Sequence, residues 1–597
     1  MKNFYFLVLF LLSIISYAQN FSQYKRIFST YAGPEGTIPV DTKTLNNQNL
    51  LIIGSIGTKK TNLSIPYLNS FTVPTDPNFT YNIRNTNPLN IEDTTSNYYF
   101  AELTPTGERI KSGYLNLDFY SSNIANPNLF IGRVNPNDPL FIGQFNSDYS
   151  YQILHQLPTN LTLNNQVNLH STIYVDEAFN IYIQGSVSAP IAQFNSSTSF
   201  INEFRTRQII YEYDDEVEVE NIQNGVFYKM NLQGEFLWGT YLDIYAIADF
   251  TIGNDEVYIL ANYSTNDLST IPQDIGVTQP NSFQTTATKN FFLRLNATNG
   301  NYIYSTYFGN NNILHNYVTY NNGSLYFASR LTAVFNDSRL ISTDAYQTTP
   351  FNRSSSYLGK FDLNFTPIWG TYISGNRSTA IDQVMNRNRK INILNDKIYI
   401  SGNTMATQNL ITGESIEQHY GGGFNDNFIM KFTTNGQFIY GSYFGGINSE
   451  QHPYIQPISE DTYYLIGTTS SDKGISTTNA YQFQFSLHPI NTENSTPSNM
   501  YFGKFGPESL LNTSDLITSN IKIYPNPSHN KQLSIDGYLA KGSSIEMYNL
   551  IGQKIFEQKT HPINKHFIHF PSIPSGTYLI KVISSKNEII TQKIIVK

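Results

Sequence analysis

The amino-acid sequence predicts an all-β chain, a seven-bladed β-propeller followed by a small Ig-like β-sandwich. An aromatic tetrapeptide returns at nearly even spacing, two further strand-like segments return in phase with it, and the last part of the chain changes in charge and pattern. At 597 residues, the chain is too long for one compact core unless a repeat architecture extends it. Six or eight blades are the alternatives, because the second and third repeats are irregular.

Composition excludes several classes of protein. Aromatic residues and charged residues each make up 14% of the chain, which argues against disorder and against a coiled coil. The net charge of -8, with no basic stripe, argues against a nucleic-acid-binding protein. The chain has no cysteine, so disulfides, thiolate zinc sites and cysteine nucleophiles are excluded.

The first residues predict a secretory signal peptide over residues 1–18. Lys2 precedes an apolar run from Phe4 to Ile15, and Ser16-Tyr17-Ala18 places small residues at the -3 and -1 positions, so we expect cleavage between Ala18 and Gln19. The run is shorter than the roughly 20 residues that a membrane-spanning helix needs. No later stretch is apolar enough, so we expect no transmembrane span in the mature chain.

The repeated tetrapeptide, here called the anchor, defines the blades. It reads Trp238 to Tyr241, Tyr304 to Tyr307, Trp369 to Tyr372 and Tyr440 to Tyr443, with weaker copies ending at Tyr31 and Tyr114 and a degenerate seventh at Ile153 to Gln156. A bulky aromatic beside small residues suits the wedge between neighbouring blades. We therefore expect structural roles for Tyr31, Tyr114, Trp238, Tyr241, Tyr307, Trp369, Tyr372 and Tyr443, with sugar stacking by the two tryptophans as the weaker alternative.

Two other strand signals occur seven times each. After the anchors, and mostly behind polar turns, come Leu50–Ile53, Leu129–Ile131, Ile181–Ile183, Val257–Ile259, Leu325–Phe327, Ile398–Ile400 and Tyr463–Leu465. Before the anchors come Tyr99–Leu103, Leu140–Phe145, Val226–Met230, Phe291–Leu295, Tyr357–Phe361, Phe428–Phe432 and Tyr501–Phe505.

The two ends of the repeat array complement each other. The first anchor, at Tyr31, lacks a strand of the preceding type, and the last such strand, at Phe505, lacks a following anchor. A closed ring in which an N-terminal strand completes the last blade explains both, and it leaves only short protected edges. The sequence therefore predicts a propeller over residues 19–507.

The best-formed repeats resemble the SBBP-type β-propeller repeat of secreted bacterial proteins. The resemblance rests on Gly402-Asn403-Thr404, the Ala-Tyr-Gln elements at 345–347 and 480–482, and the run from Tyr440 to Gly446, and it extends over Phe292 to Gly446. It implies a propeller in an extracellular setting. The family carries no single activity, so the resemblance implies no catalytic residues.

The C-terminal part is a second module. Ile521–Lys597 holds ten Lys, no Arg and four acidic residues, a net of +6, against -14 for the remainder of a chain whose total is -8. Glu508 to Asn520 is a polar stretch suited to a linker. Alternating residues and Pro/Gly turns predict a small antiparallel β-sandwich over residues 521–597.

This tail closely resembles the type A C-terminal sorting domain of the type IX secretion system. The motifs that carry the resemblance are Tyr524, Pro525, Asn526, Pro527, Gly552, Gly576 and Tyr578. The resemblance implies that the signal peptide takes the chain into the periplasm and that the secretion machinery recognises the tail at the outer membrane. Tail removal then leads to release or to attachment to surface lipopolysaccharide. An accessory sandwich that merely stabilises the chain is the alternative.

Motifs for chemistry are scarce, so we predict no catalytic, cofactor-binding or metal-ligating residues. Zinc-protease, nucleophile-elbow, phosphate-loop and EF-hand patterns are all missing from the sequence. The acidic run from Asp214 to Glu220 fits a solvated hairpin tip better than a cation site, and Gly421–Gly423 fits a flexible connection. His566 and His569 fall on opposite faces of an expected strand, and we expect both at the surface.

Two functional classes follow from these observations. Export and the missing catalytic motifs favour a secreted or outer-surface protein that binds or adheres to a glycan or a protein without catalysing a reaction. The alternative is an extracellular glycan hydrolase or lyase that uses scattered carboxylates at the propeller channel, because propellers support both roles.

Overall fold

The structure is a computed structural model of the chain. It describes residues 24–33, 37–45, 49–56, 79–80, 97–115, 117–122, 128–134, 138–147, 149–156, 173–176, 178, 180–187, 190–194, 201–202, 207–213, 216–222, 224–242, 246–262, 281–310, 313–331, 338–351, 355–375, 391–412, 415–477, 480, 498–507, 522–528, 531–539, 543–549, 552–560, 563–570, 573–583 and 589–597. The expected signal peptide, Ala18 and Gln19 included, and most of the expected linker lie outside these residues.

The described part of the chain is all-β, as predicted, and it contains strands but no helix. The chain divides into two compact units. One is Arg26–Gly506, and the other comprises Met1–Lys25 and Pro507–Lys597. Each is considered by itself.

Seven sheets of four or five strands form the larger unit, and they are numbered here as sheets 1 to 7. In spatial order, sheet 1 has β2 (Thr37–Thr44), β3 (Leu50–Ile56), β5 (Asn97–Leu103), β6 (Arg109–Leu115) and β4 (Phe79–Thr80), and sheet 2 has β7 (Asp118–Ser122), β8 (Leu129–Arg133), β9 (Phe141–Phe145) and β10 (Tyr151–Gln156). Sheet 3 has β11 (Ile173–Val175), β12 (Ile181–Val187), β15 (Asn224–Met230) and β16 (Phe236–Leu242), and sheet 4 has β17 (Ala246–Gly253), β18 (Glu256–Asn262), β19 (Asn290–Asn296) and β20 (Tyr302–Tyr307).

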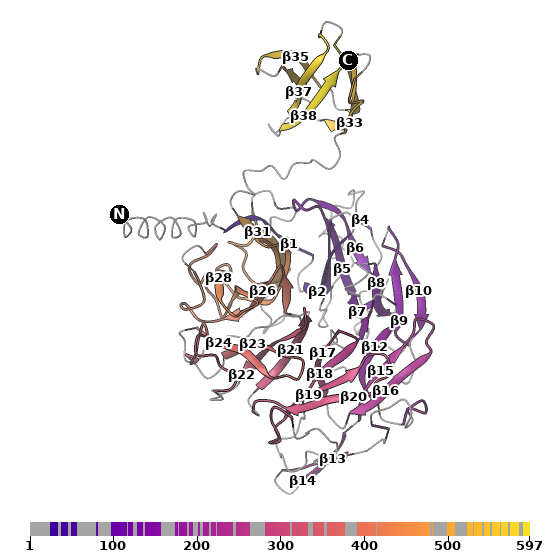
Figure 1. The fold of residues 1–597 in the computed structure, drawn as a ribbon, viewed down its shortest axis with the longest axis vertical. Helices are drawn as coiled ribbons and strands as arrows, with labels where there is room; N and C mark the ends of the chain where they lie inside the picture. Colours follow the sequence, from indigo (N-terminus) through magenta and orange to yellow (C-terminus); the bar gives the residue numbers. More distant parts are fainter. Residues whose placement is uncertain are drawn as a thin grey trace, which may run out of the picture. The chain divides into compact units, whose positions relative to one another are not determined.

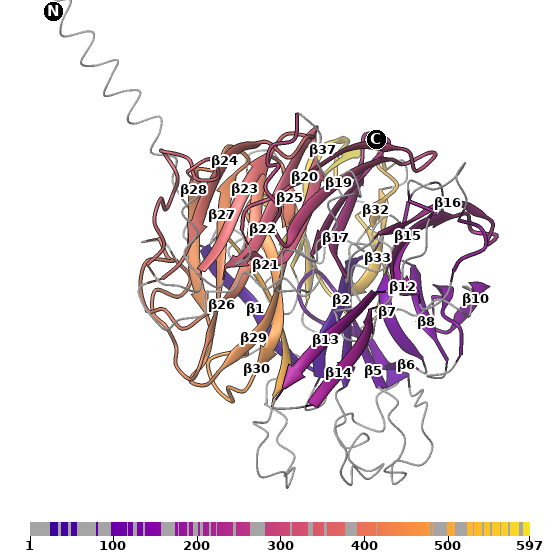
Figure 2. The ribbon, with the colours of Figure 1, turned by 90° about the horizontal axis from the view of Figure 1, so that it is seen from below.

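The remaining sheets continue the pattern. Sheet 5 has β21 (Ile313–Asn321), β22 (Ser324–Leu331), β23 (Ser355–Phe361) and β24 (Pro367–Ile373), and sheet 6 has β25 (Asn392–Leu394), β26 (Lys397–Thr404), β27 (Asp426–Thr433) and β28 (Phe438–Phe444). Sheet 7 has β29 (Glu450–Ser459), β30 (Thr462–Thr469), β31 (Asn499–Pro507) and, from the other end of the chain, β1 (Tyr24–Ala32). Figure 2 shows one such sheet, with β21, β22, β23 and β24 side by side.

Sequence and structure agree on the strands of the repeat. Each of the fourteen strand segments predicted between the anchors lies in a strand, except that β9 begins one residue after Leu140. One element was not foreseen from the sequence, the short parallel strand β4 at the edge of sheet 1. The hairpin expected around the acidic run is present as β13 (Arg207–Tyr213) and β14 (Glu216–Ile222), which pair with each other alone. The hairpin is inserted between two strands of sheet 3.

The predicted polar turns form tight hairpins because their residues tolerate positive φ. Asn254 and Asp255 have φ of 54° and 57°, and Asn395 and Asp396 have φ of 48° and 59°. Two consecutive positive φ values are typical of the type I′ turn, whose twist matches that of the strands it joins. These turns set the register between the first and second strands of sheets 4 and 6.

Buried side chains join successive sheets into a ring. Separate apolar clusters lie between sheets 1 and 2, 2 and 3, 3 and 4, 4 and 5, 5 and 6, and 7 and 1. Between sheets 6 and 7 the Phe444 ring lies 4.9 Å from Tyr501 and 5.2 Å from Phe505. Figure 1 shows the sheets of this unit following one another around the ring.

A basic residue on the third strand adds a second contact between neighbouring sheets. The Lys229 ammonium lies 4.9 Å from the ring centre of Tyr182 on the adjacent strand, and it donates to the Ala297 carbonyl of sheet 4 at 3.0 Å. Lys504 in sheet 7 similarly donates to the Pro105 carbonyl of sheet 1 at 3.1 Å. Burial lowers the pKa of Lys229, which is the cost of placing this cation between two sheets.

The C-terminal unit contains two sheets around one apolar cluster. One sheet has β32 (Lys522–Tyr524), β33 (Gln532–Leu539) and β36 (Ile563–His569), and the other has β35 (Lys554–Lys559), β34 (Ser544–Tyr548), β37 (Gly576–Ile583) and β38 (Ile589–Val596). Alternating residues of both sheets, among them Ile535, Met547 and Ile580, are fully buried in that cluster.

Candidate functional site

The anchors occupy the last strand of their sheets. Tyr31, Trp238, Tyr241, Tyr307, Tyr372 and Tyr443 are buried, and Trp369 is half-buried. Tyr114 lies on β6, opposite Tyr99, and its side chain is outside the described set. The degenerate seventh anchor falls on β10.

Both tryptophans contact the sheet that follows their own. The Trp238 indole nitrogen donates to the Ala297 carbonyl at 3.0 Å, and the Trp369 indole nitrogen donates to the Thr434 carbonyl at 3.0 Å. Each ring also covers a glycine in the hairpin of the next sheet, Gly300 or Gly436, both at positive φ. This geometry supports interblade packing, because the Trp238 ring has no face open to a sugar.

The acidic run from Asp214 to Glu220 is described only in part. Asp214 and Asp215 lie outside the described residues, and Glu216, Glu218 and Glu220 lie on β14. Within the described part of the chain, no group of three or more His, Asp or Glu side chains is arranged to hold a metal ion.

Two expectations are wrong in detail. Gly421–Gly423 is not a loose connection, because a Cβ at Gly421 or Gly422 would lie 2.4 Å from the Gly446 carbonyl oxygen or 2.6 Å from that of Ile447. His569 is exposed as expected, but His566 is buried at 4% exposure, since its face of β36 packs on the tail core.

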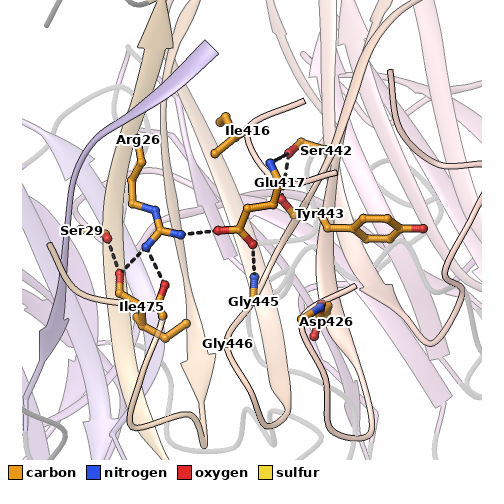
Figure 3. Close-up of polar contacts among 12 residues, drawn as sticks. Arg26, Ser29, Ile416, Glu417, Asp426, Ser442, Tyr443, Gly445, Gly446 and Ile475 are labelled. Atoms are coloured by element: carbon orange, nitrogen blue, oxygen red, sulfur yellow. Dashed lines mark hydrogen bonds and ion pairs between the residues drawn. The ribbon is translucent and has the colours of Figure 1, made fainter. Parts of the chain in front are cut away.

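The most unusual group of side chains lies where sheet 6 meets sheet 7. It consists of Arg26 on β1, Glu417 before β27, Asp426 at the start of β27 and Glu450 at the start of β29, and it is called the closure cluster here. Figure 3 shows Arg26 reaching from β1 toward Glu417, with Asp426 on the far side of Gly445. Asp426 and Glu450 are fully buried.

Arg26 and Glu417 form the polar link across this junction. The Arg26 guanidinium pairs with Glu417 Oε1 and donates to the carbonyls of Gly474 at 2.6 Å and Ile475 at 3.0 Å. The other carboxylate oxygen of Glu417 accepts from the Gly445 amide at 2.9 Å. The ion pair is partly buried, and each partner makes further hydrogen bonds that offset the lost contact with water.

The other two carboxyl groups converge on Gly445. Glu450 accepts from the Thr469 and Ser471 hydroxyls, both at 2.6 Å, and from the Gly446 amide at 3.0 Å. Asp426 Oδ2 accepts from the Gly421 amide, whereas Asp426 Oδ1 is buried without a hydrogen-bond partner among the described residues. A Cβ built on Gly445 would lie 2.5 Å from Glu450 Oε2 and 2.7 Å from Asp426 Oδ1, so both oxygens crowd the same point.

Burial is the largest cause of the pKa shifts in this cluster. It raises the pKa of Asp426 to about 8, with the neighbouring charges of Glu450 and Glu417 adding to the rise. It raises the pKa of Glu450 to about 7 against the lowering effect of its hydroxyl and amide donors. The Glu417 pKa is also raised by burial, with Arg26 opposing the shift. Both shifts favour the protonated forms of Asp426 and Glu450.

Reading the sequence alone missed the closure cluster, although a signal exists in the repeat. Glu417 occupies the position of Gln284 and Gln347, since the backbone N–H of each donates to a hydroxyl on the last strand of its own sheet. Asp426 occupies the position of Asn499, since Asp426 pairs with Thr404 and Asn499 pairs with Thr469 at the start of their third strands. Two neutral amides of the repeat are thus acids at one junction.

The expected sorting motifs are distributed over the C-terminal unit. The Asn526 amide donates to the Lys593 carbonyl at 2.8 Å, and its oxygen accepts from the Ile595 amide at 2.9 Å, which ties the Tyr524–Pro527 segment to β38. The peptide bonds before Pro525 and Pro527 are cis. Gly552 has φ of 81° in the turn between β34 and β35, and Gly576 begins β37. The Tyr578 hydroxyl donates to the Pro574 carbonyl at 2.9 Å.

The C-terminal unit matches a known domain family. Residues 522–597 match the family described as secretion system C-terminal sorting domain, so the tail is such a domain. The chain is also similar to ulvan lyase NLR42 from Nonlabens ulvanivorans, at 30% identity over 79 residues. That similarity covers 13% of this chain and 14% of the lyase, so the chain spans about one seventh of the relative's length.

Solved structures show only distant likeness. The phage phi92 endosialidase is 10% identical, with 96% of this chain and 87% of that chain covered at a TM-score of 0.32. The subtype N11 neuraminidase-like protein of A/flat-faced bat/Peru/033/2010 is 7% identical, with 65% and 86% covered at a TM-score of 0.27. Such values transfer no activity to this chain. Among the described residues, no helix is long and apolar enough to cross a membrane.

The interblade contact of Trp238 generates a prediction with a matched control. In Gly300→Ala the new methyl group would lie 2.5 Å from the Trp238 ring at φ of +72°, so we expect a loss of about 2–4 kcal/mol from overpacking and backbone strain together. Gly323 has φ of +74° with nothing within 4 Å, so Gly323→Ala should lose only about 1 kcal/mol.

Thermal unfolding of the full chain, followed by tryptophan fluorescence, measures this difference. The chain has two tryptophans, so the signal reports the two interblade contacts directly. Equal destabilisation by the two substitutions would show that the Trp238–Gly300 contact is not tightly packed.

Proposed function

We propose that this protein is an exported β-propeller that binds or adheres to a glycan or a protein without catalysing a reaction. The observation that carries the proposal is the sorting domain at residues 522–597. In this proposal the type IX secretion machinery recognises that domain, and the product reaches the outer cell surface or the medium by way of the periplasm.

The proposed division of the chain follows from the same reasoning. Residues 1–18 are a signal peptide, 19–507 the propeller, 508–520 a linker and 521–597 the sorting domain. The ring of seven sheets supports a seven-bladed propeller of the SBBP repeat type, and the two sheets of the tail support an Ig-like sandwich. After removal of the tail, surface lipopolysaccharide is the proposed attachment partner.

Burial of the closure cluster supports binding over catalysis. A glycosidase needs two carboxyl groups that reach the sugar from opposite sides. Asp426 and Glu450 converge, but both are fully buried, so a polysaccharide has no access to them. An extracellular glycan hydrolase or lyase with a site at the propeller channel is the second candidate.

Deletion of residues 521–597 tests the export route. We expect the truncated chain to accumulate in the periplasm, because the outer-membrane step has lost its recognition element, while the full chain appears on the surface or in the medium. Cell fractionation with protease accessibility measures this. A tail fused to a periplasmic reporter should in turn export the reporter, and surface display of the truncated chain would contradict the proposal.

A polysaccharide screen of the full chain separates the two candidate functions. We expect retention on at least one glycan or protein support without new reducing ends or unsaturated uronate products. Affinity electrophoresis measures the retention, and a reducing-sugar assay with ultraviolet absorbance measures the products. Release of either product in proportion to protein concentration would establish the enzyme instead.

A further inference from the structure

Sheet 7 is assembled differently from every other sheet of the ring. Its last strand, β1, comes from the opposite end of the chain, so no hairpin ties it to β31. Side-chain contacts help to hold it: the Tyr31 hydroxyl donates to the Ser471 carbonyl at 2.8 Å, and the Thr477 hydroxyl donates to the Ser29 carbonyl at 3.1 Å. Arg26 supplies the charged contact of this strand with sheet 6.

Glu417, which pairs with Arg26, differs from the glutamine at the same position of sheet 5 in a way that allows the ion pair. The Gln347 side chain stays within its own sheet, where its amide donates to the Ser374 hydroxyl at 2.8 Å. Glu417, at the same position of sheet 6, has no amide to donate, and its carboxylate pairs with Arg26 of β1. A carboxylate is the partner that a guanidinium binds most strongly.

The start of β27 departs from the repeat in the same direction. Asp426 pairs with Thr404 as Asn499 of β31 pairs with Thr469, so an acid stands at the register position that holds an amide in sheet 7. The Asn427 amide beside Asp426 donates to the Tyr501 hydroxyl of β31. Asp426 has the shape of Asn, but it donates a hydrogen bond only when protonated. Its Oδ1 is buried without a hydrogen-bond partner among the described residues, so ionisation would leave a buried charge that is only partly hydrogen-bonded.

The titratable and charged groups of the cluster around Asp426 come from four elements. Glu417 lies before β27, Glu450 begins β29, Tyr501 belongs to β31, and Arg26 reaches in from β1. Arg26 is paired with Glu417, so ionised Asp426 and Glu450 would add two buried negative charges at one junction. Burying like charges close together costs several kcal/mol, which protonation avoids.

We propose that the closure cluster is a pH-sensitive clasp, in which the protonated Asp426–Glu450 pair holds β1 in the ring and ionisation of that pair loosens it. The clasp acts on the junction between the two ends of the propeller, independently of any ligand.

The sign of the effect follows from linkage. Asp426 and Glu450 have pKa values of about 8 and about 7 in the folded protein, above the ordinary values of 3.8 and 4.5. The closed state therefore binds more protons than the open one across this range, and the stability it gains is present at low pH. That stability falls as the pH rises above the ordinary values and is lost once the pH has passed the folded values.

Hydrogen exchange of the full chain, read by mass spectrometry and corrected for intrinsic exchange rates, tests the clasp. Between about pH 6 and about pH 8.5, we expect the protection factor of β1 to fall on the order of tenfold or more, and that of β18 and β19 in sheet 4 to change much less. Asp426→Asn introduces the residue that stands at the same register position of β31, so it should flatten the β1 profile and keep β1 protected at the higher pH.

Two further variants complete the test. Glu450→Gln should flatten the β1 profile in part, and it serves if Asp426→Asn folds poorly. Glu256→Gln is the matched control: Glu256 is a largely buried carboxylate paired with Arg294 within sheet 4, so its loss should leave the pH profile of β1 unchanged. An unchanged β1 profile in both Asp426→Asn and Glu450→Gln would overturn the clasp, as would a parallel pH response of β1 and β18 in the wild type.

Discussion

Closure of the ring by β1 is the constraint on which the rest of the larger unit depends. Six sheets are continuous in the chain, and apolar clusters or, between sheets 6 and 7, contacts of the Phe444 ring join each to its neighbours. Those clusters bury both faces of a sheet only if every sheet has two neighbours, so sheets 7 and 1 must also meet. They do so through Phe28, Tyr99, Tyr464 and Phe502, and Phe28 itself lies on β1. A missing first strand would therefore expose apolar surface on two sheets.

The fold was largely predictable because its pattern is local and repeated. Alternation of apolar residues predicts strands, and Asn-Asp or Asn-Gly pairs predict the hairpins between them. The complementary ends at Tyr31 and Phe505 predicted the strand pairing that closes sheet 7. The acidic run from Asp214 to Glu220 predicted the hairpin of β13 and β14, although that segment lies outside the repeat period. The short strand β4 was not predictable, because it also lies outside the repeat period and carries no such local signal.

The closure cluster was not predictable because it joins residues that no local pattern connects. Arg26 and Glu417 lie at opposite ends of the array, and each looks like an ordinary surface charge in its own segment. Only the superposition of repeats shows that Glu417 and Asp426 replace amides. His566 shows the same limit on a smaller scale, since strand alternation assigned its face correctly but could not tell which face packs on the core.

The pairing of β1 with the rest of sheet 7 also affects the order in which the chain folds. Ser29 and Thr477, which bond across it, are 448 positions apart in the chain. For a flexible chain, closing a loop of that length costs about 3 kcal/mol more than closing a short hairpin. Contacts of such high order form late in folding. The N-terminal strand therefore stays unpaired until the last repeat has been synthesised. A chain that crossed a membrane before that moment would cross it with an open, aggregation-prone ring.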